Sequence, residues 1–349
     1  TKYLPKPAKM EALRRFMSRV GKSLPHAHEW SLDRVVQHYH GPKRKRYSDA
    51  ASSYRANGIS KRDSAVKMFI KCEKIAFKRS KKNPDPRAIQ YRDPVYAVLL
   101  ATYLKPIEEI VYQLKGNRLN GLPPDRLIGK GLNQKQRAAL LRKKWERFRK
   151  PKCGSLDARR YDQHISYDHL RAEHGLYKAM NRSRTFATLL SWQLVNKVTT
   201  SRGIKYKTRG KRMSGDMNTA LGNCAIMVCM LALFFDGRDI LWDCLDDGDD
   251  ILLIMEEEDF DMVKEELLMH FQELGMDMKV ENETNIFEQI EWCQSRPICV
   301  DGQWTFIRDV GKVLSGALVG NKWTQMKSER SRRGLANTIG MCEAILNDG

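Results

Sequence analysis

The clearest pattern along the chain is a pair of apolar runs separated by a short acidic segment. Residues 240–242 and 251–254 are apolar, and residues 246–250 read DDGDD. Short apolar runs bounded by turn residues are typical of strands, and Gly248 permits the backbone of a tight turn between them. We therefore predict a strand, a turn and a second strand, with carboxylates projecting from the edge of a buried sheet.

The adjacent carboxylates of this turn are candidate metal ligands. Like charges held this close repel each other, so one carboxylate is expected to take up a proton unless a cation lies between them. Oxygen ligands at this density suit Mg²⁺ or Mn²⁺. The alternative is an acidic hairpin turn on a solvated surface, because Asp-Gly turns are common.

A second acidic pair lies upstream of the hairpin. Residues 155–156 predict the end of a short strand, and Asp157 and Asp162 follow, five positions apart. We expect Asp157 to point to the same place as Asp249, so that two separate elements supply carboxylates. A site that holds two metal ions roughly 3.5–4 Å apart requires such an arrangement.

A third polar segment lies between the two acidic ones. Ser214 and Gly215 predict a turn that opens a helix. Thr219 and Asn223 lie four positions apart and therefore share one face of this helix. They precede the apolar run of residues 225–235. Their side chains either face a ligand or form the polar first turn of a buried helix.

In this order the three segments closely resemble the palm motifs of viral RNA-dependent RNA polymerases. The matching residues are Asp157 and Asp162 for motif A, Ser214, Gly215, Thr219 and Asn223 for motif B, and Gly248, Asp249 and Asp250 for motif C. The sequence of residues 157–166 (DARRYDQHIS) is most similar to that of the plant tombusvirus family. With the flanking segments described below, the resemblance covers nearly the whole chain.

The resemblance implies an α+β fold of the right-hand polymerase type and template-directed transfer of nucleotides to the 3′-hydroxyl of RNA. Asp157 and Asp249 would be the main ligands of Mg²⁺ or Mn²⁺, with Asp250 as a supporting carboxylate. One ion would assist attack by the 3′-hydroxyl. The other would neutralise charge on the triphosphate and the leaving pyrophosphate.

The same resemblance implies a site that recognises the ribose of the incoming nucleotide. Its residues would be Asp162, Ser214, Gly215, Thr219 and Asn223. A 2′-hydroxyl both donates and accepts hydrogen bonds, and it distinguishes RNA from DNA building blocks. A reverse transcriptase, which is the related alternative, would be expected to carry a bulky aromatic residue in place of Asp162.

Two basic segments would form the fingers. Residues 39–47 mix cations with aromatic residues around a Gly-Pro turn and resemble motif G, in which Lys43, Arg44 and Arg46 would guide the RNA template. The alternative there is a solvated basic loop. Residues 141–150 predict a basic amphipathic helix, which we expect to be a solvated face.

Residues 67–74 and 86–92 predict two strands joined by a loop, and they resemble motif F. Lys71 and Arg87 would contact the triphosphate, because a guanidinium binds phosphate through two parallel hydrogen bonds and keeps its charge. Ile89 would pack on the base. Lys74 and Arg92 are further candidates for the triphosphate.

Downstream segments match the remaining motifs. Residues 259–274 have helical spacing, with Asp259 as candidate N-cap and a glycine beyond the end. Residues 276–281 predict a strand that resembles motif D, in which Lys279 would protonate the departing pyrophosphate. Residues 291–295 resemble motif E, where Cys293 and Gln294 would support the primer end. Residues 303–308 predict a strand that leads into thumb helices.

Charge and cysteine content agree with this interpretation. The 349 residues carry a formal net charge of +20, which implies a polyanionic partner. An anionic membrane surface is the alternative, but acidic clusters inside a basic protein favour nucleic acid handled at a metal site. The 8 cysteines include no C-x2-C pair, so buried thiols in a reducing compartment are favoured over disulfides or zinc.

We expect residues 1–150 to form the fingers, with an insertion at 173–212. Residues 151–172 and 213–295 would form the palm, and residues 296–349 a partial thumb. The cations Lys322, Lys327, Arg330, Arg332 and Arg333 would either bind the product duplex or be solvated.

The resemblance also implies partners and a location. The partners would be a single-stranded RNA template, the RNA product, nucleoside triphosphates and an auxiliary viral replication protein. The location would be membrane-associated replication complexes in the host cytoplasm, reached through an upstream anchoring region outside this sequence. We expect a fragment, because the chain starts at Thr1 and ends soon after motif C. A non-catalytic RNA-binding protein is the remaining alternative.

Overall fold

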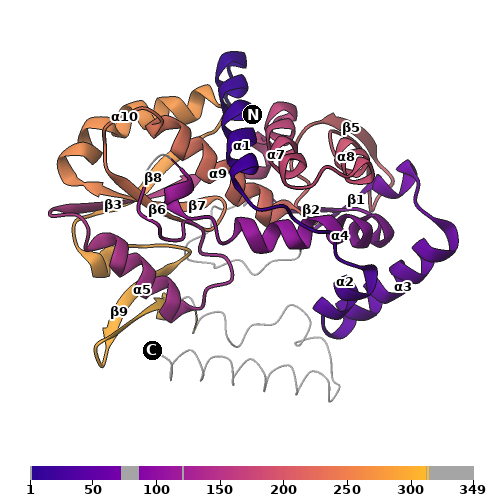
Figure 1. Ribbon diagram of the computed structural model, residues 1–349, viewed down its shortest axis with the longest axis horizontal. Coiled ribbons are helices and arrows are strands. Elements are labelled where there is room, and N and C mark those ends of the chain that lie inside the picture. The colour runs from indigo at the N-terminus through magenta and orange to yellow at the C-terminus, as the bar shows by residue number, and fades with distance from the viewer. Residues whose placement is uncertain (1, 72–85, 120–121, 312, 314–349) are drawn as a thin grey trace.

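The computed structural model describes residues 2–71, 86–119, 122–311 and 313, which fold into helices and β-sheets (Figure 1). The α-helices of these residues are α1 (Pro7–Ser23), α2 (Leu32–His38), α3 (Gly41–Asn57), α4 (Pro94–Val111), α5 (Gln134–Trp145), α6 (Tyr161–His164), α7 (Tyr167–Met180), α8 (Arg184–Ser191), α9 (Thr219–Phe235) and α10 (Glu257–Glu273). The strands are β1 (Val66–Ile70), β2 (Ala88–Tyr91), β3 (Pro151–Ala158), β4 (Val195–Thr200), β5 (Lys205–Arg209), β6 (Trp242–Asp246), β7 (Asp250–Glu256), β8 (Met278–Thr284), β9 (Ser295–Val300) and β10 (Gln303–Arg308). The predicted α+β class is therefore confirmed.

The sheet that carries the acidic hairpin is antiparallel, in the order β6-β7-β3-β8. The predicted hairpin is present as β6, residues 247–249 and β7, but β6 begins at Trp242, the last residue of the apolar run 240–242. Gly248 has a φ of 104°, a left-handed conformation that other residues rarely adopt. Asp157 near the end of β3 lies opposite Asp250 on β7 and Lys279 on β8. The register thus brings these residues to the same end of the sheet.

Both faces of this sheet are buried. Ile251, Leu253 and Met255 of β7 pack into a core shared with α9 and α10. The alternate residues Leu252 and Ile254 pack into a second core with α5 and the β9–β10 hairpin. Figure 1 shows α10 on one side of the sheet and α5 with β9 on the other. Burial on both faces explains why the centre of β7, residues 251–255, reads as an uninterrupted apolar run.

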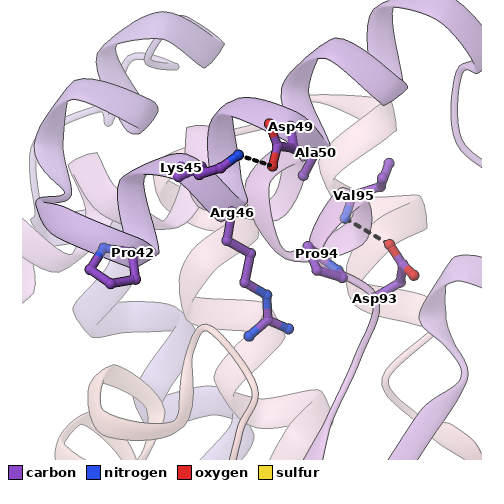
Figure 2. Close-up of a pocket in the computed structure, with 8 residues that line it drawn as sticks. All are labelled: Pro42, Lys45, Arg46, Asp49, Ala50, Asp93, Pro94 and Val95. Atoms are coloured by element: carbon purple, nitrogen blue, oxygen red, sulfur yellow. Dashed lines mark hydrogen bonds and ion pairs between the residues drawn. The ribbon is translucent and has the colours of Figure 1, made fainter. Parts of the chain in front are cut away.

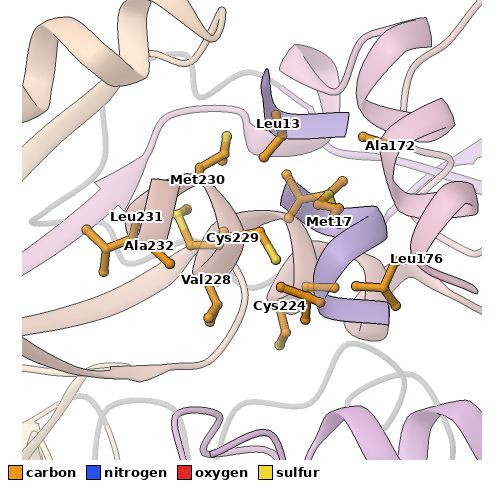
Figure 3. Close-up of a cluster of buried hydrophobic side chains, with 14 of the residues drawn as sticks. Leu13, Met17, Ala172, Leu176, Cys224, Val228, Cys229, Met230, Leu231 and Ala232 are labelled. Carbon is orange, nitrogen blue, oxygen red and sulfur yellow. The ribbon is translucent and has the colours of Figure 1, made fainter. Parts of the chain in front are cut away.

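Helix α9 is the centre of the larger core. Its residues from Leu221 to Ala232 are buried without interruption. Figure 3 shows Cys224, Val228 and Cys229 of this helix beside Met17 of α1 and Leu176 of α7. The helix is apolar on all sides, as expected of a helix enclosed by other elements. Its first turn, which carries Thr219 and Asn223, is thereby fixed against the rest of the molecule.

A second sheet has the order β2-β1-β4-β5, in which β1 and β4 are parallel and the other pairs antiparallel. The predicted ribbon is present, because β1 pairs with β2 and the Lys71 amide donates to the Arg87 carbonyl at 2.8 Å. Strands β4 and β5 come from the segment 173–212. Far-separated parts of the chain therefore share one sheet.

Several local expectations were wrong. The Gly-Pro pair at 41–42 is the first turn of α3 rather than a loop, because proline lacks only an N–H that the first helical turn leaves unbonded. The N-cap of α10 is Glu256, and Asp259 lies within its first turn. Lys144, expected on a solvated helix face, is fully buried and binds Asp243.

Some predicted residues lie outside the described part of the chain. These are Lys74 and the thumb cations Lys322, Lys327, Arg330, Arg332 and Arg333. Within the part that is described, none of the helices combines the length and apolar character needed to cross a bilayer.

Candidate active site

Three predicted ligands meet where β3 and β7 approach the acidic turn. Asp157 faces Asp250 across the strand pair, and the Ala158 amide donates to the Asp249 carbonyl at 3.4 Å. The Asp247 amide donates to the Asp250 carbonyl at 2.9 Å and closes the turn. Asp249 is exposed, whereas Asp157 and Asp250 are half-buried. The backbone therefore brings Asp157, Asp249 and Asp250 near one another.

The electrostatics of this edge disfavour negative charge. Burial, together with smaller contributions from the neighbouring carboxylates Asp249 and Asp157, raises the pKa of Asp250 to about 6. Burial also raises the pKa of Asp157, with a smaller contribution from Glu281. A divalent cation would relieve this repulsion, and carboxylate oxygens are the ligands that Mg²⁺ and Mn²⁺ prefer. The donor set therefore fits such an ion.

The carboxylates are not already arranged around one point. Within the described ranges no three His, Cys, Asp or Glu side chains form a group that could hold a metal ion. Instead, the ammonium of Lys279 lies 3.7 Å from Oδ2 of Asp157 and also contacts Glu281. Ligand binding would therefore require these side chains to rotate. Lys264 on α10 pairs with Glu283.

The four carboxylates of the turn differ in their surroundings. Asp246 does not project from the sheet: its side chain is completely buried, and burial raises its pKa well above the usual range. Asp247 instead contacts Lys130, and it accepts from Arg137 at 2.9 Å. Only Asp249 and Asp250 remain for an ion. The sequence did not distinguish these roles, because their partners come from distant segments.

The predicted ribose site is partly assembled. Asn223 Nδ2 donates to Oδ1 of Asp162 at 3.0 Å. The Ser214 hydroxyl donates to the Ala88 carbonyl at 3.2 Å, so it ties motif B to β2. The Thr219 hydroxyl donates to the Met213 carbonyl at 2.9 Å. The structure therefore joins Asp162 to Asn223 directly, whereas the hydroxyls of Ser214 and Thr219 donate to backbone carbonyls.

A cavity of about 520 Å³ connects the motifs. Its lining includes Ser214, Gly215 and Asn223 from motif B and Asp249 from motif C. Lys43 of α3 lines it as well, with its ammonium 4.4 Å from the centre of the Tyr39 ring. Burial lowers the pKa of Lys43, and the nearby charge of Lys105 lowers it further. A cation of the predicted template-guiding segment thus faces the same space as the acidic turn.

The other cations of that segment face elsewhere. Arg46 lies in a separate hollow between α3 and the start of α4, where Asp93 and Pro94 form part of the wall (Figure 2). Its guanidinium is 5.9 Å from the centre of the Tyr91 ring. Arg44 is exposed on α3. The structure therefore does not bring Lys43, Arg44 and Arg46 to one point.

The predicted ribbon approaches the site through β2, whose Ala88 carbonyl accepts from Ser214. Burial raises the pKa of Asp162, and the hydrogen bond from Asn223 and the positive charges of Arg212 and Arg87 oppose this rise. Lys71 is exposed beside Arg87 at the end of the ribbon, and Ile89 is half-buried on β2. Arg92 was a wrong candidate for the triphosphate. It is buried and forms an ion pair with Asp216 at 2.6 Å.

Cys293 and Gln294 form a tight turn beside the hairpin. Their φ values are 50° and 61°, and Trp292 and Ser295 on either side exchange two backbone hydrogen bonds of 2.9 Å. The Cys293 thiol lies 3.5 Å from Oδ2 of Asp247. The predicted primer-supporting segment is therefore next to the acidic turn.

Comparisons with known proteins agree with these motifs. The family described as "Viral RNA dependent RNA polymerase" matches residues 1–349. The RNA-directed RNA polymerase of Groundnut rosette virus (strain MC1) is 38% identical over 305 residues, which are 86% of this chain and 35% of the relative. That of Tobacco necrosis virus (strain D) is 32% identical over 353 residues, 99% of this chain and 48% of the relative. That of Tomato bushy stunt virus (strain Cherry) is 35% identical over 308 residues, 86% and 37% respectively.

The chain thus spans about a third to a half of the length of these curated relatives. The predicted resemblance to viral RNA polymerases, including those of the tombusvirus family, is confirmed.

Proposed function

Because this chain belongs to the viral RNA-dependent RNA polymerases, we propose that it carries the centre that adds nucleotides to RNA under the direction of an RNA template. The observation that carries the proposal is the convergence of Asp157, Asp249 and Asp250 at one sheet edge, beside a cavity lined by motif B. The substrates would be nucleoside triphosphates and a single-stranded RNA template. The fold would be of the right-hand polymerase type.

Asp157, Asp249 and Asp250 would hold the divalent ions, Mg²⁺ or Mn²⁺. When bound, two such ions supply positive charge at the attacking 3′-hydroxyl and at the leaving pyrophosphate. The raised pKa values of Asp157 and Asp250 support this assignment, because a cation would favour their ionised forms. Lys279 would leave Asp157 and become available to give a proton to the departing group.

The remaining residues would position the substrate. Arg87 and Lys71, at the end of the finger ribbon, would bind the triphosphate. Asp162, held by Asn223 at 3.0 Å, would accept a hydrogen bond from the ribose 2′-hydroxyl. A site built to bind a hydroxyl rejects an analogue that lacks it, because its buried polar groups are then left unpaired. Cys293 and Gln294 would support the end of the growing RNA.

The test is incorporation of labelled ribonucleotides on a short single-stranded RNA with Mg²⁺ or Mn²⁺. The parent chain is compared with the double variant Asp249→Asn/Asp250→Asn. We expect template-dependent product from the parent only, with RNA binding retained by both. Both proteins would also be prepared with extensions to the length of the relatives. Equal RNA binding without incorporation by either extended protein would instead support a non-catalytic RNA-binding protein.

A further inference from the structure

A buried ion pair lies directly behind the predicted ribose site. Arg212 precedes motif B, and its guanidinium binds the carboxylate of Glu173 on α7 through hydrogen bonds of 3.2 and 2.6 Å. The side chains are 1% and 0% exposed. Removing both charges from water is costly unless their hydrogen bonds are satisfied. Neither residue belongs to the motifs identified in the sequence.

Arg212 also contacts both members of the assembled part of the ribose site. Its Nε donates to Oδ1 of Asn223 at 3.0 Å. Its backbone amide donates to the carbonyl of Asp162 at 3.0 Å. Asn223 then donates from Nδ2 to the Asp162 carboxylate at 3.0 Å. One arginine therefore holds the main chain of Asp162 and the side chain that binds its carboxylate.

The chemistry of a guanidinium fixes which way the Asn223 amide points. Arginine can only donate, so the Asn223 oxygen must face it. The amide nitrogen is then directed at Asp162. In the reversed orientation the nitrogen would face the arginine donors and the oxygen would face the carboxylate, so both contacts would be repulsive. Among the described residues, Asn223 binds only Oδ1 of Asp162, which leaves Oδ2 for a ligand.

Glu173 is itself held in place on its other side. Asn218 Nδ2 donates to Glu173 Oε1 at 2.6 Å, and Gln193 Nε2 donates to Oδ1 of Asn218 at 2.9 Å. All of these side chains are buried. The guanidinium therefore cannot swing away from Asn223 without breaking a connected set of buried hydrogen bonds.

Glycine at position 222 allows the ion pair to lie this close to α9. A Cβ atom at Gly222 would lie 2.3 Å from Oε1 of Glu173 and 2.4 Å from Nη2 of Arg212. Any other residue would displace the pair. The glycine is thus a second requirement for the contact between Arg212 and Asn223.

We propose that Arg212, held by Glu173, is a positioning residue for nucleotide selection, because it fixes Asn223 in the orientation that lets Asp162 bind a ribose 2′-hydroxyl. This inference rests on the proposed function and extends it to residues that do not touch the substrate. It concerns selectivity between ribonucleotides and 2′-deoxynucleotides rather than nucleotidyl transfer itself.

The test compares ATP with 2′-deoxy-ATP in the parent and in Arg212→Lys. Lysine keeps the charge beside Glu173 but lacks the planar fork that bridges Glu173 and Asn223. We expect the ratio of kcat/KM for ATP to that for 2′-deoxy-ATP to fall by about tenfold or more, because kcat/KM for ATP decreases. The ratio of the equilibrium binding affinities for ATP and 2′-deoxy-ATP is measured as well, because binding requires no turnover. Absence of incorporation by the extended parent would refute the proposed function, and the ratio of affinities would still test this inference.

Two further variants separate positioning from folding. Lys144→Gln breaks another fully buried ion pair, with Asp243, that has no contact with Asn223. It should lower the melting temperature and keep the parental ratio. Asn223→Ala as a single variant should lower the ratio. The double variant with Arg212→Lys should lower it no further, because the two residues act through one contact.

Three results would overturn the inference. One is a parental ratio in a folded Arg212→Lys protein. Another is a ratio in the Asn223→Ala/Arg212→Lys double variant that falls by the product of the two single effects. If Arg212→Lys does not fold, Glu173→Gln takes its place, since it keeps an acceptor but removes the charge that holds the guanidinium. A parental ratio in Glu173→Gln would also contradict the proposal.

Discussion

At the scale of single residues, identical side chains in one turn have different partners. Asp249 and Asp250 face the candidate metal site, Asp246 is buried, and Asp247 binds Lys130 and Arg137. The contacts with Lys130 and Arg137 tie the acidic turn to the segment before α5 and to α5 itself. Asp247 therefore holds the turn in place rather than binding an ion.

Replacing Asp247 tests this role. Asp247→Ala would remove the carboxylate shared by two partly buried cations, so we expect the free energy of unfolding to fall by about 1–3 kcal/mol. The control is Asp261→Ala, which removes an exposed partner of Lys152 and should change stability by no more than about 0.5 kcal/mol. Urea unfolding measures both. Equal effects of the two substitutions would show that the Asp247 contacts contribute no more than a surface pair.

A buried histidine gives a pH-dependent contribution to stability. Burial lowers the pKa of His270 to about 4, and its Nε2 lies 3.0 Å from the Met230 carbonyl. In the unfolded chain its pKa is about 6.5. As pH falls from about 6.5 to about 4, the unfolded chain takes up a proton that the folded chain does not, so stability is lost over that range, by roughly 1.4 kcal/mol per pH unit.

His270→Gln isolates this term. Glutamine can still donate to the Met230 carbonyl but does not titrate. We expect the stability of the variant to fall less steeply than that of the parent between pH 6.5 and 5, as measured by urea unfolding at each pH. Parallel curves would mean that His270 titrates normally in the folded chain.

At the scale of elements, close approach of α10 to the sheet that carries the acidic hairpin depends on a glycine. A Cβ atom at Gly154 of β3 would lie 2.4 Å from the Phe260 ring of α10. The pattern of apolar residues predicted both elements, but it did not indicate how near they would lie. Gly154 lies on β3 three positions before Asp157, so its packing affects the strand that carries a proposed ligand.

Gly154→Ala should therefore destabilise the protein by about 1–3 kcal/mol, because the core must move to accept the methyl group. Gly175 of α7 provides the matched control. Nothing lies within 4 Å of a Cβ there, so Gly175→Ala should be neutral or stabilise by up to about 1 kcal/mol, through the better helix propensity of alanine. Thermal unfolding would distinguish them, and a neutral Gly154→Ala would show that Phe260 can move aside at little cost.

At the scale of the whole molecule, the net charge of +20 dominates any encounter with RNA. Binding should weaken steeply as salt rises, because each neutralised phosphate releases counterions. Helix α3 contributes Lys43, Arg44 and Arg46, which face different directions. Any RNA that contacts all three must therefore follow the helix surface rather than enter one pocket.

A triple variant of Lys43, Arg44 and Arg46 to Ala measures that contribution. If all three contact phosphates, the slope of log affinity against log salt should become shallower by about 2, at roughly 0.7 for each contact with a single strand. The matching control is Arg14, Arg15 and Arg19 of α1 changed to Ala, which removes the same charge from another helix. Equal changes in both variants would assign the effect to net charge alone.

The sequence by itself determined the class of the fold and the family. The apolar runs around residues 246–250 predicted the hairpin, the spacing of Thr219 and Asn223 predicted a shared helix face, and the order of the three motifs predicted the polymerase resemblance. These features are local, since each depends on residues a few positions apart. The period of apolar side chains and the turn preference of glycine are sufficient to predict them.

Tertiary structure alone decided which charged residues are functional candidates and which are structural. Arg92 was a candidate for the triphosphate and Lys144 was expected on a solvated helix face, yet each is buried beside an aspartate more than 90 positions away. Arg212 and Glu173 are 39 positions apart and meet only because α7 and the segment before α9 pack together. Charge is visible in a sequence, but its partner is not, because ion pairs depend on distances in space that the folded chain sets.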